Sequence, residues 1–134
     1  MDLTRLKRRL YHNAYARRAF YLPSDLAQYA QRRRTGSLTP PRGLVAIGPG
    51  DAEAIGREFL DYFIRLAELK PDHRVLDVGC GVGRIAAPLA DYLSPGGSYE
   101  GFDIVSGGIE WCQTNITPRF PNFRFQVADI YNRT

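Results

Sequence analysis

The stretch VLDVGCGVGR (75–84) places three glycines at alternate positions directly behind an apolar run that contains one acid, Asp77. An apolar run of this length, bounded by turn residues, indicates a buried strand, and the segment RIAAPLADYL (84–93) indicates a helix. Glycine is favoured where the backbone takes a positive φ, or where a Cβ would hold a ligand away from the main chain. The stretch therefore predicts a strand–turn–helix unit whose backbone N–H groups face a ligand.

The segments that follow this turn repeat the alternation of strand and helix. Strands are predicted at 98–104 and 122–130 and a helix at 107–116, while the first strand, 73–79, is expected to be buried between helix layers. This order is typical of the α/β class. It predicts a Rossmann-like parallel sheet with strand order 3-2-1, because right-handed crossovers connect parallel strands.

The part of the chain before the sheet differs from the rest in charge. Residues 1–43 contain ten basic and two acidic residues, whereas residues 44–134 contain eight basic and twelve acidic residues. This contrast predicts a boundary between a basic helical extension and an α/β domain. Within the extension, helices are expected over 3–20 and from Ser24 to the arginines at 32–34.

A further helix is expected between the extension and the first strand. It begins near Asp51, where an acid favours the helix N-terminus, and Pro71 stops it. Its apolar residues recur at helical spacing and form one stripe. They are Ile55, Phe59, Tyr62, Phe63, Leu66 and Leu69.

The composition of the chain indicates which class of protein and which cellular compartment to expect. No apolar run approaches the roughly 20 residues needed to cross a bilayer, and the charged N-terminus contains no signal-peptide core. The two cysteines, Cys80 and Cys112, are too few for a disulfide scaffold, so a reducing compartment, the cytoplasm, is expected. His12 and His73 lack metal-ligand spacing, and no metal site is predicted.

Several kinds of nucleotide site use such a glycine turn. A P-loop is excluded because no Gly-Lys-Ser/Thr ends the turn. A dinucleotide site stays open, since Gly81-x-Gly83-x-x-Ala86 fits the G-x-G-x-x-G/A pattern and Asp103 lies 20 residues beyond Gly83. Asp77 argues against it, because a carboxylate at the end of the first strand would repel a pyrophosphate but suits a cationic ligand.

The segment DVGCGVG (77–83) resembles the D/E-x-G-x-G-x-G signature of class I S-adenosylmethionine-dependent methyltransferases. GFDI (101–104) resembles the second-strand motif of that family, and VADI (127–130) resembles the end of its third strand. The resemblance covers about residues 44–134. It implies the cofactor-binding, N-terminal half of a seven-stranded sheet. In this family, substrate and catalytic groups usually follow the fourth strand, so no catalytic residue is assigned.

The resemblance also implies S-adenosylmethionine as the cofactor and a role for each matching residue. The implied cofactor-binding positions are Asp77, Gly79, Cys80, Gly81, Gly83, Asp103, Ile104, Asp129 and Ile130. The glycines would let the main chain approach the methionine and ribose portions. Cys80 is expected to fill the loop, and Asp77 would help to position the amino-acid end.

The resemblance implies that the acids after the second and third strands bind the ribose and the adenine of the cofactor. Asp103 would accept both ribose hydroxyls, with Ile104 packed against the adenine. Asp129 would accept the adenine amino group, and Ile130 would line the same pocket. Hydroxyls and exocyclic amines are donors, and carboxylates are strong acceptors for them.

Methyl transfer to a small-molecule acceptor is therefore the expected function. Two alternatives stay open: an NAD(P)-binding oxidoreductase half-domain, and a non-catalytic module that binds RNA or an anionic membrane through residues 1–43. The simpler interpretation of the arm is a solvated extension that folds over the acidic domain or a subunit partner. An unpaired edge on the first strand would also favour oligomer formation.

Overall fold

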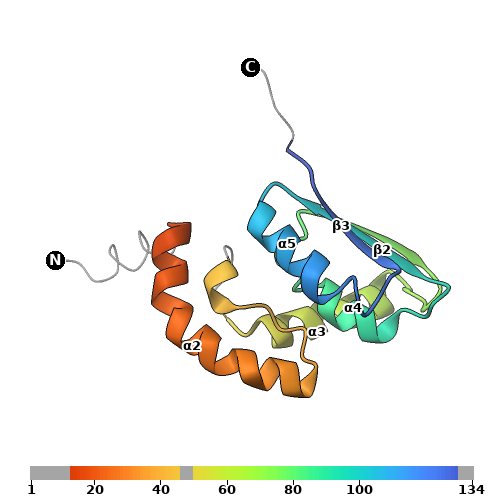
Figure 1. The fold of residues 1–134 in the computed structure, drawn as a ribbon. Helices are drawn as coiled ribbons and strands as arrows, with labels where there is room; N and C mark the ends of the chain where they lie inside the picture. Colours follow the sequence, from red (N-terminus) through yellow and green to blue (C-terminus); the bar gives the residue numbers. More distant parts are fainter. Residues whose placement is uncertain (1–12, 46–49, 130–134) are drawn as a thin grey trace. The chain divides into compact units, whose positions relative to one another are not determined.

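The computed structural model describes residues 13–45 and 50–129 (Figure 1). The chain divides into two compact units, Met1–Pro49 and Gly50–Thr134. The boundary that the charge contrast favours, between residues 43 and 44, stays a prediction. None of the described helices is both long and apolar enough to cross a membrane.

A single long helix, α2 (Ala14–Thr35), makes up most of the first unit. Asn13 caps it by accepting two backbone N–H groups, and Gly36 ends it with a φ of 68°. The prediction of separate helices on either side of Pro23 is wrong, because Pro23 lies inside α2, which is bent rather than interrupted (Figure 1). Residues 3–12 of the first expected helix lie outside the described residues.

Charged side chains of α2 hold the short 3-10 turn η1 (Arg42–Leu44). The Asp25 carboxylate accepts the N–H groups of Arg42 and Gly43 at 2.8 and 2.9 Å. The buried Arg17 donates from Nε to the Gly43 carbonyl at 3.1 Å. Most of the large apolar side chains of α2 are exposed instead: Tyr15, Phe20, Leu22, Leu26 and Tyr29.

The second unit is an α/β layer. Its elements are α3 (Ala52–Leu66), β1 (Arg74–Val78), α4 (Ala86–Tyr92), β2 (Ser98–Asp103), α5 (Ser106–Asn115) and β3 (Phe123–Val127). The strands are parallel in the order β1-β2-β3, which confirms the predicted order 3-2-1 read from the opposite edge. The predicted elements differ from the observed ones by a few residues at their ends, and Pro88 lies in the first turn of α4, where proline is tolerated.

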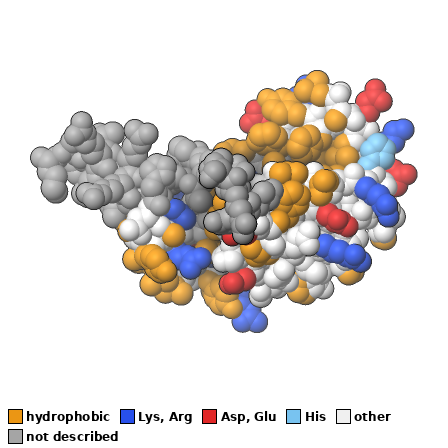
Figure 2. All heavy atoms as spheres, turned by 90° about the horizontal axis from the view of Figure 1, so that it is seen from above, with side chains coloured by type: hydrophobic (Ala, Val, Ile, Leu, Met, Phe, Trp, Pro, Cys, Tyr) orange, Lys and Arg blue, Asp and Glu red, His pale blue; other side chains and the backbone are white. Residues whose placement is uncertain are grey.

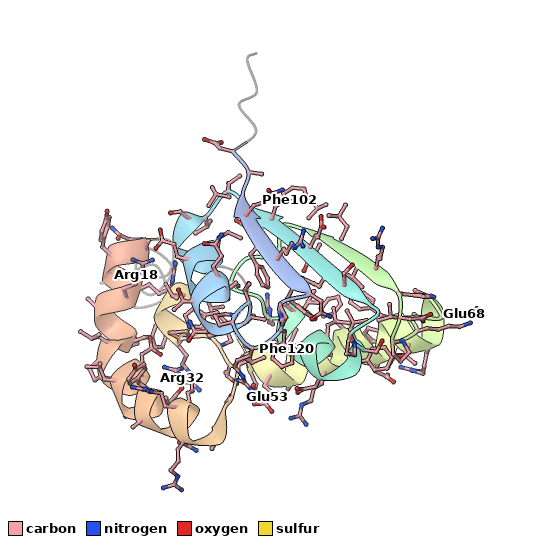
Figure 3. All side chains as sticks on the ribbon, turned by 45° about the vertical axis from the view of Figure 1, so that its right-hand side comes forward. Arg18, Arg32, Glu53, Glu68, Phe102 and Phe120 are labelled. Atoms are coloured by element: carbon pink, nitrogen blue, oxygen red, sulfur yellow. The ribbon has the colours of Figure 1, made fainter. Side chains whose placement is uncertain are left out.

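Helices cover one face of this sheet in the described residues. Val75 pairs with the buried Tyr99 on the face where α5 packs against β2 and β3 (Figure 1). On the other face, Leu76 and Val78 are 66% and 69% exposed, and Phe102, the partner of Val78, lies beside them (Figure 3). The prediction that β1 is buried between two helix layers is therefore wrong for this part of the chain. Successive right-handed crossovers that step in one direction place their helices on the same face.

The core lies between the covered face of the sheet and helices α4 and α5. Tyr99 stacks on Phe123, with ring centroids 5.1 Å apart and planes at 12°. The largest fully buried side chains are Tyr99, Phe123, Leu89, Ile109, Ile116 and Cys112. These core contacts hold the strands and helices in place next to the glycine turn, which connects β1 to α4.

Helix α3 packs against α4 through a glycine. A Cβ on Gly56 would lie 2.4 Å from the Arg84 carbonyl oxygen, so only glycine permits this approach. The predicted apolar stripe is buried only in part: Phe59, Tyr62 and Leu66 are 41%, 39% and 78% exposed, whereas Ile55, Phe63 and Leu69 are half-buried. The helix also ends at Leu66, well before the proline that was expected to stop it.

Candidate functional site

The glycine turn after β1 has two open glycines and one packed glycine. Gly79, Gly81 and Gly83 all have a positive φ, at 83°, 58° and 72°, so each position favours glycine. A Cβ on Gly79 or Gly81 would meet no atom within 4 Å, whereas a Cβ on Gly83 would lie 2.8 Å from Sγ of Cys112. Gly79 and Gly81 are therefore accessible to a ligand, and Gly83 lets the turn rest on α5.

The backbone N–H groups of the turn are used inside the protein. Gly79 and Cys80 both donate to the Phe102 carbonyl, at 2.8 and 3.1 Å, and Gly83 donates to the Cys80 carbonyl at 3.0 Å. Gly81 donates to a side chain, Oδ2 of Asp103, at 2.8 Å. The prediction that these N–H groups face a ligand is wrong, because the end of β2 lies close enough to satisfy three of them.

Asp103, at the end of β2, connects that strand to the turn. Its Oδ2 accepts the Gly81 N–H and its Oδ1 accepts the Val105 N–H, both at 2.8 Å. The side chain is only partly buried. A carboxylate has about four lone-pair sites, so each oxygen retains capacity for one further donor. The two backbone bonds fix the carboxylate in a single orientation beside the open glycines.

Asp77 lies on β1, on the same covered face as Tyr99. Its Oδ2 accepts a hydrogen bond from the Tyr99 hydroxyl at 2.5 Å, the short distance expected for a charge-assisted bond. Its Oδ1 accepts no hydrogen bond from a described residue. The structure therefore ties Asp77 to β2 rather than to the N–H groups of the glycine turn.

Two of the remaining predicted positions, Ile104 and Asp129, follow the carboxyl-terminal ends of β2 and β3. Ile104, just beyond β2, is 67% exposed. Asp129, just beyond β3, is exposed and has no hydrogen-bond partner among the described residues. Ile130 lies outside them. The structure therefore brings Asp77, Asp103 and the turn together, and among the described residues Asp129 makes no hydrogen bond to them, although its neighbour Ala128 donates to the Asp103 carbonyl at 3.1 Å. Residues 13–45 and 50–129 contain no cluster of His, Cys, Asp and Glu arranged to hold a metal.

Both cysteines point into the protein near the turn. Sγ of Cys80 would lie 2.9 Å from a Cβ on Gly101, and the side chain is 7% exposed, as expected for a residue that fills the loop. Burial raises the pKa of the Cys80 thiol to about 12, and the nearby Asp77 and Asp103 carboxylates add to the effect. Burial also raises the pKa of Cys112. Both side chains are therefore neutral thiols at physiological pH.

This burial predicts a loss of stability at alkaline pH. The ordinary thiol pKa of 9.0 rises to about 12 for Cys80 in the folded chain, so its contribution to stability is complete below pH 9 and is lost as the pH rises toward 12. The slope for one thiol is at most about 1.4 kcal/mol per pH unit. Urea unfolding at several pH values below and above 9 measures the free energy of unfolding. Its decline with rising pH should be less steep in Cys80→Ala than in the unsubstituted chain. An equally steep decline in that variant would contradict the assignment.

The sequence reasoning missed three residues that shape the site. Tyr99 reaches Asp77, Gly101 makes room for Tyr99 and Cys80, and Gly108 of α5 allows close approach to the turn. A Cβ on Gly108 would lie 2.6 Å from the Gly81 carbonyl oxygen. Glycines inside a strand or a helix are a recognised signal of close backbone approach, and that signal is present at both positions.

A glycine turn at positive φ between β1 and a helix, with acids at the ends of parallel strands, defines a nucleotide-binding site of the Rossmann-like class. Residues 69–134 match a family described as a methyltransferase domain. This match covers the glycine signature and supports the predicted resemblance to the class I S-adenosylmethionine-dependent methyltransferases.

One curated relative is a probable cobalt-precorrin-6B C(15)-methyltransferase (decarboxylating) from Thermoplasma acidophilum. It is 29% identical over 65 residues, which are 47% of this chain and 32% of that protein. The chain thus spans about a third of the length of this relative.

Solved structures of methyltransferases are also similar in fold. A coclaurine N-methyltransferase bound to N-methylheliamine and SAH has a TM-score of 0.48 at 22% identity, covering 55% of this chain and 22% of that one. A SAM-dependent methyltransferase from Aquifex aeolicus has a TM-score of 0.46 at 20% identity, covering 55% and 38%.

Proposed function

We propose that this chain provides the S-adenosylmethionine-binding part of a methyltransferase. The observation that carries the proposal is the orientation of Asp103. Two backbone N–H groups hold its carboxylate at the end of β2, next to the open side of Gly79 and Gly81. The match of residues 69–134 to a methyltransferase domain supports the same ligand.

The residues of the site suit the chemistry of this cofactor. S-adenosylmethionine has a positively charged sulfonium, an ammonium group, and two neighbouring ribose hydroxyls. Asp103 can accept both hydroxyls with its remaining lone pairs, and Asp77 has an oxygen available for the positively charged end. Gly79 and Gly81 leave room for the ligand to lie against the main chain. When bound, the cofactor supplies an activated methyl group.

The adenine end of the proposed site is formed by residues beyond β2 and β3. The exposed Ile104 side chain offers an apolar surface to the base, and the Asp129 carboxylate is available to accept its amino group. Ile130 is proposed to line the same pocket. These residues bind and orient the cofactor, and no described residue is assigned a part in the chemical step.

We further propose a small-molecule methyl acceptor. The name of the curated relative, which refers to cobalt-precorrin-6B, supports this class of acceptor. Positioning the acceptor and the methyl group in line accounts for much of the rate of such a displacement.

Calorimetry with S-adenosylhomocysteine and with NAD tests the proposal. We expect the 134-residue chain to bind one S-adenosylhomocysteine and no NAD. Asp91→Asn, which removes an exposed acid from α4 at the opposite end of the sheet, is the control and should bind S-adenosylhomocysteine normally. Binding of NAD without S-adenosylhomocysteine would favour the oxidoreductase alternative and refute the proposal.

A second role is proposed for α2 because its exposed surface combines apolar and basic side chains (Figure 2 shows the two kinds side by side on the surface). Phe20, Leu22 and Leu26 are 69%, 53% and 62% exposed. Residues 13–45 contain six arginines and one acid, and that acid, Asp25, is engaged with η1. Exposed aromatic side chains such as Phe20 can stack on bases, but exposed leucines cannot, and leucines beside basic side chains on one helix suit an anionic membrane surface.

Vesicle co-sedimentation tests this second role. We expect the chain to bind vesicles with about 30% phosphatidylserine and to bind pure phosphatidylcholine vesicles at least about tenfold more weakly. The double substitution Leu22→Ser and Leu26→Ser should abolish most of this binding. Leu66→Ser, which changes an exposed leucine of α3, is the matched control and should leave it unchanged. Salt-dependent binding to single-stranded RNA without vesicle binding would overturn the membrane assignment.

A further inference from the structure

We infer that Tyr99 is a positioning residue that orients the Asp77 carboxylate for the cofactor. This inference rests on the proposed S-adenosylmethionine site and adds a residue to it that no motif contains. It is argued from the way the Tyr99 ring is held, from the bond that it makes, and from the space that Gly101 leaves for it.

The ring of Tyr99 is held firmly in the core. Its side chain has no exposed area, and the ring stacks on Phe123 with centroids 5.1 Å apart. The ring of Phe125 lies against it as well, at 5.5 Å. A phenol ring fixed on two sides can direct its hydroxyl at only one place.

Gly101 provides the space through which Tyr99 reaches Asp77. In the strand register Asp77 pairs with Gly101, and Tyr99 pairs with Val75. Tyr99 and Asp77 are therefore diagonal neighbours on one face of the sheet, and the Tyr99 hydroxyl reaches Asp77 by passing over Gly101. A Cβ on Gly101 would lie 2.9 Å from Cε1 of the Tyr99 ring. The ring therefore occupies the place that any larger residue at position 101 would take.

The bond between Tyr99 and Asp77 fixes one carboxylate oxygen and leaves the other available. The hydroxyl donates to Oδ2 at 2.5 Å, while Oδ1 accepts no hydrogen bond from a described residue. Burial and the nearby Asp77 charge raise the pKa of Tyr99, so the phenol remains a donor throughout the physiological range. Without this donor, the partly buried Asp77 would lose the bond that holds its orientation.

A double-mutant cycle on S-adenosylhomocysteine affinity tests the inference. Tyr99→Phe keeps the stacked ring and removes the hydroxyl, and we expect it to weaken binding by about tenfold or more. Asp77→Asn should weaken binding at least as much. Because Tyr99 acts through Asp77, adding Tyr99→Phe to Asp77→Asn should cause little further loss, which a purely structural role of the ring would not predict.

Tyr92→Phe is the matched control. Its hydroxyl donates to the Leu69 carbonyl at 2.7 Å, away from the site, so its loss should leave affinity unchanged. Gly101→Ala, which crowds the Tyr99 ring, is a second variant and should weaken binding in the same direction. Wild-type affinity in Tyr99→Phe, or fully additive losses in the double variant, would overturn the inference while the proposed function stands. Absence of S-adenosylhomocysteine binding by the unsubstituted chain would refute both.

Discussion

Replacing Asp103 with alanine is expected to reduce the affinity of the chain for S-adenosylhomocysteine by about a hundredfold or more. The carboxylate is proposed to accept both ribose hydroxyls, and a hydrogen bond to a charged group contributes about 1.5–3 kcal/mol. The same oxygens accept the N–H groups of Gly81 and Val105. The substitution therefore removes the proposed ligand contacts and also releases the turn that lies beside the ligand.

Asparagine at position 103 separates these two effects. Its single carbonyl oxygen can keep one of the two backbone bonds, while the charge and the second acceptor are lost. Calorimetry should therefore show a loss for Asp103→Asn that is smaller than the loss for Asp103→Ala. The control Asp91→Asn removes a charge of the same kind from α4 and should bind normally. Wild-type affinity in Asp103→Ala would show that this carboxylate has no role in binding.

The glycine turn and the order of the strands could be predicted because local signals specify them. A short apolar run, alternate glycines and a helical segment each act over a few residues, and the handedness of the crossover then determines the order of the strands. Asp77 and Asp103 were recognised in the same way, as acids at the ends of strands. Their hydrogen-bond partners could not be recognised, since Tyr99 and Gly81 each lie 22 residues away in the chain.

The uncovered face of the sheet could have been expected from the topology. Leu76 and Val78 have the apolar character of a strand buried on both sides, and their composition suggested a second helix layer. The direction in which the strands are added opposes that expectation, because β1, β2 and β3 step one way and α4 and α5 return on one face. The apolar composition of β1 indicates that its side chains favour burial, whereas the connections between the strands determine which face of the sheet the helices cover.

Helix α2 shows a different limit of sequence reasoning. Pro23 usually ends a helix because it lacks an N–H and its ring crowds the preceding turn. Here the helix continues through it with a bend (Figure 1), and Asp25 and Arg17 hold η1 against both halves. Contacts between residues distant in the chain therefore outweigh the local cost of the proline.

Gly83→Ala is expected to cause the largest loss of stability, lowering the free energy of unfolding by about 3 kcal/mol. Two costs contribute. The φ of 72° lies in the left-handed region, which strains alanine. In addition, the new Cβ would lie 2.8 Å from Sγ of Cys112 and 3.0 Å from Cδ1 of Ile116, both fully buried on the α5 side of the turn. These atoms belong to the core and have little freedom to move aside.

Gly96→Ala is the matched control, because Gly96 lies in an exposed turn and a Cβ there would meet its nearest atom, Oγ of Ser94, at 3.7 Å. Urea unfolding of the two variants should show a large loss for Gly83→Ala and a change within about 0.5 kcal/mol for Gly96→Ala. Combining Gly83→Ala with Cys112→Ala should recover part of the loss, because the smaller side chain gives the new methyl group space. If the loss from Gly83→Ala is as large in Cys112→Ala as in the unsubstituted chain, the contact with Sγ is not the source of the cost, which then arises from the strained φ or from the contact with Ile116.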